Sequence, residues 1–96
     1  MKRVEITPSK IKGKKHTAIF YENNKKIKTT HFGSAGMSDF TINKDEDRKK
    51  RYLSRHRARE NWNAPMTAGA LSRWILWNKK SKRASIADYK KRFNLN

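Results

Sequence analysis

Three features of the sequence predict an α+β fold with an N-terminal three-stranded antiparallel sheet covered by about three helices. Residues 1–34 contain short β-branched and aromatic segments that are separated by turn-forming residues. Charge order and apolar spacing typical of helices begin only near Asp45. A chain of 96 residues has room for one core, so we expect a single domain over residues 1–96.

The N-terminal third of the chain predicts a meander of three short strands. Apolar and β-branched residues gather in the segments 4–6, 18–21 and 27–32. The second and third segments are joined by Glu22–Lys25, whose two asparagines tolerate positive φ, which predicts a tight hairpin loop. The lysine-rich stretch 10–15 is expected to form a charged loop between the first two strands.

The first helix is predicted over residues 45–59. Three acids, Asp45 to Asp47, precede a run of bases, and this charge order stabilises a helix dipole. Between the sheet and this helix, Met37, Phe40 and Ile42 are expected to anchor an irregular crossing on the sheet.

Two further helices are predicted after Pro65, which breaks the first one. Thr67 is the expected N-cap of a helix that is apolar nearly all round as far as Trp77, which favours burial against the sheet. Ser85 and Asp88 resemble a capping box for the last helix. That helix carries one apolar stripe, made of Ile86, Tyr89 and Phe93.

Positive charge is the dominant functional signal. The chain has 25 Lys and Arg against 8 Asp and Glu, a formal net charge of +17. Self-repulsion of this size disfavours a compact state and attracts anions at long range, so the expected partner is a polyanion. The sequence has no long apolar run, no apolar signal stretch near its start and no cysteine, so we expect a protein that does not enter a membrane and is not secreted.

The sharpest local pattern is a line of arginines on the first predicted helix. Arg48, Arg51, Arg55 and Arg59 are spaced by three, four and four residues and share one face, while Tyr52 and Leu53 lie toward a different side. Guanidinium groups suit phosphate because their planar fork donates two parallel hydrogen bonds. The alternative is an ordinary solvated face. The candidate nucleic-acid-binding residues are Arg48, Lys50, Arg51, Arg55, Arg57, Arg59, Trp62, Lys79, Lys80, Lys82 and Arg83.

Some of these residues have a second interpretation. Trp62 follows the arginine helix and either stacks on a base or folds over the end of its own helix, and a lone aromatic favours the second role. The lysines of the β-part either contact a polyanion or protect an edge strand from aggregation.

No catalytic, metal or cofactor site is predicted, and we expect neither an enzyme nor a small-molecule substrate. The three histidines, His16, His31 and His56, are scattered, and the acids show no ligand or dyad spacing. Asp39 near His31 suggests an acid–base pair, but a capping or turn role for Asp39 is favoured. A small nuclease is therefore the least favoured function.

The chain also resembles a family of small uncharacterised basic proteins encoded by large nucleocytoplasmic DNA viruses, the phycodnavirus and mimivirus group. The resemblance covers roughly residues 31 to 93 and implies a viral origin and a compact α+β domain, with no catalytic residues to carry over. It departs at Lys80, where proline is expected. The matching motifs are His31-Phe32-Gly33, Ser38-Asp39-Phe40-Thr41, Lys44-Asp45, Arg48-Lys49-Lys50-Arg51-Tyr52, Arg55-His56, Thr67-Ala68-Gly69 and Ser72-Arg73-Trp74-Ile75-Leu76-Trp77.

Together, charge and resemblance predict a sequence-nonspecific nucleic-acid-binding protein of a large DNA virus, with DNA favoured over RNA. Phosphate contacts position a protein without reading bases, which is why no sequence specificity is expected. The alternative is a minor virion protein whose basic face binds acidic virion proteins. The expected location is the virion, or the host cytoplasm or nucleus at sites of viral replication.

Overall fold

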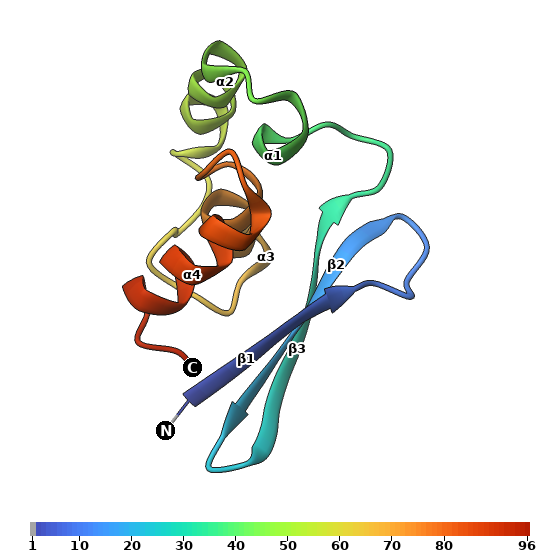
Figure 1. The fold of residues 1–96 in the computed structure, drawn as a ribbon, viewed down its shortest axis with the longest axis vertical. Coiled ribbons are helices and arrows are strands. Elements are labelled where there is room, and N and C mark those ends of the chain that lie inside the picture. The colour runs from blue at the N-terminus through green and yellow to red at the C-terminus, as the bar shows by residue number, and fades with distance from the viewer. Residues whose placement is uncertain (1) are drawn as a thin grey trace.

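A computed structural model describes residues 2–96 and shows a three-stranded sheet with helices packed on one side of it (Figure 1). The antiparallel strands, in the spatial order β1-β2-β3, are β1 (Lys2–Pro8), β2 (Lys14–Glu22) and β3 (Lys25–Ser34). The helices are α1 (Phe40–Asn43), α2 (Glu46–His56), α3 (Ala68–Leu71), the π-helix η1 (Ser72–Leu76) and α4 (Lys82–Arg92). The predicted α+β class and the strand meander are confirmed.

The alternation of the strands places apolar side chains on one face of the sheet. Val4 of β1 lies opposite Phe20 of β2, and Phe32 of β3 lies opposite His16. The turn between β2 and β3 contains Asn23 and Asn24 at φ 51° and 66°, the left-handed conformation that a tight hairpin requires. The prediction of this loop is therefore confirmed.

The core lies between the apolar face of the sheet and the segment formed by α3 and η1. Thr67 caps this segment by accepting a hydrogen bond from the amide of Ala70, as predicted. Its second half is a π-helix instead of an α-helix, and the amide of Trp77 donates to the carbonyl of Ser72 at 3.0 Å. The buried core residues of the helical layer are Phe40, Tyr52, Ala70, Leu71, Ile75, Leu76, Trp77, Tyr89 and Leu95.

The crossing between the sheet and α2 differs from its prediction. Residues 40–43 form the one-turn helix α1, and only Phe40 is anchored in the core, at 2% exposure. Met37 and Ile42 are 63% and 62% exposed, so the expectation that they anchor the crossing is wrong. Asp39 caps α1 through its side chain, which fixes the helix so that a single apolar residue points inward.

The helix predicted over residues 45–59 ends at His56. Asp45 is its N-cap, and residues 57–59 form turns in which the amide of Arg59 donates to the carbonyl of His56 at 3.1 Å. The turn lets the indole N–H of Trp62 donate to Glu60, two residues away in the sequence, whereas the contact between Glu60 and His56 has the i,i+4 spacing that a helix also provides.

The last helix begins four residues earlier than predicted. Ser81, and not Ser85, is the N-cap of α4 and accepts a hydrogen bond from the amide of Ala84. Ser85 is fully buried, and its hydroxyl accepts from the amide of Lys79 and donates to its carbonyl. The hydroxyl of either serine could cap a helix, and Ser81 is the cap because Ser85 is buried in the core.

Candidate nucleic-acid interface

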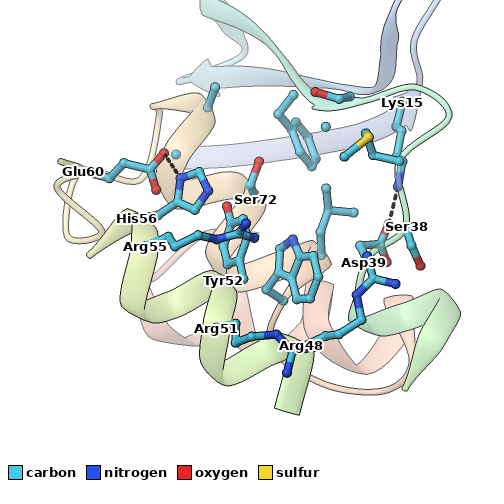
Figure 2. Close-up of a pocket in the computed structure, with 18 of the residues that line it drawn as sticks. Lys15, Ser38, Asp39, Arg48, Arg51, Tyr52, Arg55, His56, Glu60 and Ser72 are labelled. Atoms are coloured by element: carbon cyan, nitrogen blue, oxygen red, sulfur yellow. Dashed lines mark hydrogen bonds and ion pairs between the residues drawn. The ribbon is translucent and has the colours of Figure 1, made fainter. Parts of the chain in front are cut away.

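A cleft of about 870 Å³ opens between α2, the adjacent ends of β2 and β3, and the α3–η1 segment (Figure 2). Arg48, Arg51, Arg55 and Arg59 all line it. The first three project from α2, and Arg59 reaches the cleft from the turn that follows the helix. The structure thus brings together the four arginines that the sequence spacing singled out.

The way α2 docks on the core explains why its arginines face a cleft. The side chain of Asp45 accepts hydrogen bonds from the amides of Asp47 and Arg48, which fixes the start of the helix. One turn later Tyr52 is buried and stacks on Trp77, with ring centroids 4.5 Å apart and planes 8° apart. Tyr52 lines the same cleft as the arginines, so the expectation that it lies toward a different side is wrong.

The facing wall of the cleft adds two lysines that the sequence analysis did not select. Lys14 and Lys15 lie at the start of β2 and line the cleft. The ammonium group of Lys15 donates to the Asp39 carboxylate at 2.6 Å, and this pair is largely buried. The sequence predicts only a charged loop for both lysines, because nothing in the local sequence shows that β2 begins opposite the arginine helix.

The arginines of the cleft have no anionic partner among the residues that the structure describes. Among residues 2–96 the ion pairs are Arg3–Glu5, Lys15–Asp39, His56–Glu60 and Arg92–Asp88. Two carboxylates line the cleft: Asp39 is paired with Lys15, and Glu60 lies 3.5 Å from Nδ1 of His56 and accepts from the indole of Trp62. Against them stand six cations, Arg48, Arg51, Arg55, Arg59, Lys14 and Lys15. The cleft therefore carries an excess of positive charge, which favours an anionic ligand.

A stack of three rings forms one side of the cleft. Tyr52 lies between Trp77 and His56, with a centroid distance of 4.3 Å to the imidazole. Burial, together with the charge of Glu60, raises the pKa of Tyr52 to about 12, so its phenol is neutral at physiological pH. His56 is the outer ring, and its side chain is 39% exposed.

Gly33 shapes the floor of the cleft. Its φ is +79°, which favours glycine, and a Cβ atom at this position would lie 2.9 Å from Cδ1 of Leu76. The absence of a side chain therefore lets β3 lie directly against η1.

The remaining candidates on or near α2 lie outside the cleft. Lys50 and Arg57 are exposed and do not line it. Trp62 is half-buried, and its indole N–H donates to Glu60 at 3.0 Å. The guanidinium carbon of Arg73 lies 5.4 Å from the Trp62 ring centroid. The Trp62 side chain thus has partners within the protein.

The second basic cluster, Lys79, Lys80, Lys82 and Arg83, is exposed and also lies outside the cleft. Lys82 and Arg83 belong to the first turn of α4. Burial and then the charge of Lys82 lower the pKa of His16, which places this lysine near the start of β2. Of this cluster, Lys82 therefore lies within electrostatic reach of the strand that carries Lys14 and Lys15.

The lysines of the hairpin end of the sheet are separate from both basic regions. Lys25, Lys26 and Lys28 are exposed on β3, which is an edge strand. This is the position that the edge-protection interpretation requires.

Asp39 has a structural role as the cap of α1. Its carboxylate accepts from the amide and the hydroxyl of Thr41, which confirms the predicted capping role. His31 instead lies within hydrogen-bond distance of Thr17, with 2.8 Å between Nδ1 and Oγ1.

Within residues 2–96 no group of three or more His, Cys, Asp and Glu side chains could hold a metal ion. No helix of this part of the chain has the length and apolarity needed to cross a bilayer.

Sequence comparison identifies relatives for the part of the chain that builds two walls of the cleft. The chain shows no significant similarity to a curated protein or to a solved structure. Residues 4–56 match the family described as "Family of unknown function (DUF5754)". These residues include most of β1, all of β2, β3 and α1, and the arginine helix α2. Because the match extends over more than half of its length, the chain belongs to this family.

Proposed function

We propose that this protein binds nucleic acid without sequence specificity, with DNA favoured over RNA, and that Arg48, Arg51, Arg55 and Arg59 contact phosphates. One observation carries the proposal: four arginines that have no anionic partner among residues 2–96 line one cleft. A guanidinium fork donates two parallel hydrogen bonds to a phosphate or a carboxylate, and a nucleic acid presents phosphates in a regular row.

The energetics of the free protein support this proposal. Like charges three or four residues apart on a helix destabilise it by roughly 0.2–0.5 kcal/mol per pair. The pairs Arg48–Arg51 and Arg51–Arg55 therefore oppose folding in the absence of a ligand. A bound phosphate chain turns this repulsion into attraction and releases its counterions.

The basic residues outside the cleft are proposed to extend the contact. Lys82 lies near the start of β2, and Lys79, Lys80 and Arg83 are its neighbours in the sequence. Lys50 is exposed on α2 and Arg57 is exposed just after it. We leave Trp62 out of the contacts, because its indole N–H and one ring face already have partners.

A viral origin is part of the proposal. The motifs between residues 31 and 93 resemble basic proteins of large nucleocytoplasmic DNA viruses, and a large DNA genome supplies a polyanion to coat or condense. The protein would then act in the virion or at sites of viral replication in the host cytoplasm or nucleus. The competing function is a minor virion protein that binds acidic protein surfaces.

The test is a salt titration of binding by fluorescence anisotropy, with labelled 20-nucleotide DNA as a single strand and as a duplex. In the cleft variant, Arg48, Arg51, Arg55 and Arg59 are all changed to Gln. In the matched control, Lys2, Lys25, Lys26 and Lys28 at the hairpin end of the sheet are changed to Gln, which removes the same charge outside the cleft.

The expected result is a steep salt dependence that is reduced only in the cleft variant. Six phosphate contacts give a log–log slope on the order of −5 for a duplex, and loss of four contacts reduces its magnitude by about 3–4. Equal losses in both variants would show diffuse attraction without a defined face. Wild-type protein that does not bind DNA, but binds an acidic protein such as a poly-glutamate carrier, would favour the competing function.

A further inference from the structure

The cleft carries positive charge on two facing walls, which restricts what can enter it. Arg48, Arg51 and Arg55 line it from the side of α2, and Lys15 lines it from β2 (Figure 2). Because Lys15 is paired with Asp39, the exposed Lys14 supplies the net positive charge of the β2 wall. A nucleic-acid duplex is a cylinder about 20 Å across, so a space of about 870 Å³ would hold only roughly 3 Å of its length, less than one base-pair step. A duplex can therefore touch the rim of the cleft but cannot lie between its walls.

A single strand fits the same space. The volume lies in the upper part of the roughly 300–1,000 Å³ range that encloses a drug-sized molecule, and it suits about two or three nucleotides. Arg48 and Arg55 are seven residues apart, so α2 presents their charges over about 10 Å. At roughly 3.4 Å per phosphate, this is the length of about three stacked nucleotides.

The accessible ring and thioether of the cleft favour a ligand that carries bases over a bare phosphate chain. Among its apolar lining residues Met37 is 63% exposed, whereas Phe32, Leu76 and Trp77 are at most 7% exposed and close the floor from below. At one end lies His56, whose one ring face is packed on Tyr52 and whose side chain is 39% exposed. An exposed ring supported from behind by two further rings is a rigid platform, and stacking on such a ring tolerates any base.

Resting on the proposed function, we propose that the cleft selects single-stranded nucleic acid. The sugar–phosphate backbone runs along the arginines of α2, and one base stacks on the outer face of His56. On the opposite wall, the ammonium group of Lys14 neutralises phosphate charge on the other side of the strand. The duplex, which cannot enter, meets only the rim.

The experiment compares three ligands at one salt concentration near 150 mM: a labelled mixed-sequence 12-nucleotide DNA strand, the corresponding 12-base-pair duplex, and inorganic polyphosphate as a competitor at equal phosphate concentration. Wild-type protein is compared with His56→Ala and with the control Tyr21→Ala, which removes a ring that does not line the cleft. Circular dichroism melts establish that both variants are folded.

The proposal predicts that the single strand binds at least ten-fold more tightly than the duplex and that polyphosphate competes poorly. His56→Ala weakens single-strand binding about five-fold or more and leaves duplex binding unchanged, while Tyr21→Ala changes neither. Equal or tighter duplex binding that still depends on the four arginines would overturn single-strand selection and leave the proposed function standing. Equal competition by polyphosphate, or no effect of His56→Ala, would overturn the placement of the base. Failure to bind either form of DNA would overturn both proposals.

Discussion

The buried ion pair between Lys15 and Asp39 offers a sharp test of how the cleft is held in shape. It links β2 to the cap of α1, and its two side chains are 15% and 3% exposed. Asp39→Asn keeps an oxygen that can accept from the amide and hydroxyl of Thr41 and so preserves the cap. The substitution replaces the carboxylate oxygen that faces Lys15 with an amide NH2, so the ammonium group loses both its counter-charge and its hydrogen-bond acceptor.

The cost of Asp39→Asn follows from the burial of the ammonium group. Breaking a fully buried pair by removing one partner costs about 3–5 kcal/mol, and an exposed pair contributes about 0–1 kcal/mol. Because Lys15 retains some access to water, we expect a loss of about 2 kcal/mol in the free energy of unfolding. For a domain of this size that corresponds to a decrease in Tm of roughly 8–16 °C.

Urea denaturation followed by tryptophan fluorescence measures this loss, and Glu5→Gln is the matched control. Glu5 pairs with Arg3 at the surface, where the two side chains are 45% and 42% exposed, so its loss should cost less than 1 kcal/mol. The double variant Lys15→Met/Asp39→Asn should recover most of the stability, because no unpaired charge is left buried. Equal effects of Asp39→Asn and Glu5→Gln, or strictly additive effects in the double variant, would refute the reasoning.

Three further predictions concern single residues. Burial lowers the pKa of His16 below 6.5, so this residue binds fewer protons in the folded state than in the unfolded chain. The contribution of His16 to the free energy of unfolding should be fully present above about pH 6.5 and decrease as the pH falls through the lowered pKa. Urea midpoints at pH 7.5 and 5.0 should therefore differ less in His16→Gln than in the wild type, and an unchanged difference would contradict the assignment. Burial raises the pKa of Tyr52 to about 12, so stability should decrease as pH rises from about 10 towards 12, and Tyr52→Phe should reduce that decrease in melts recorded between pH 9 and 11. Gly33 and Gly13 both have positive φ, but a Cβ atom at Gly33 would lie 2.9 Å from Leu76, whereas one at Gly13 would meet open space. Gly33→Ala should therefore lower the free energy of unfolding by about 1–3 kcal/mol more than Gly13→Ala does. Equal losses in the two variants would show that β3 and η1 are not in tight contact.

The fold was predictable where local chemistry and tertiary packing agree. Alternating apolar residues and the Asn23–Asn24 turn define the sheet, and Thr67 caps the segment that fills the core. Where two residues offered the same local chemistry, packing decided. Ser81 and Ser85 could both cap a helix, and only the long-range burial of Ser85 shows which one does.

Of the candidate site, only the wall formed by the arginines could be predicted from the sequence. The spacing of Arg48 to Arg59 is a local signal, and it identified four residues that share a cleft. The facing wall depends on how β2 is placed against α2, a contact between segments more than thirty residues apart. Lys14, Lys15 and the exposed face of His56 therefore had no sequence signal of their own.

The central claim is that the arginines of the cleft are the residues that meet the ligand, and NMR observes this directly. The side-chain Nε–H resonances of arginine are followed while unlabelled single-stranded DNA is added. We predict large shifts for Arg48, Arg51, Arg55 and Arg59 and small ones for Arg3 and Arg92, which already have carboxylate partners. Shifts spread evenly over all arginines, or concentrated in the amides of Lys25 to Lys28 on β3, would contradict the account.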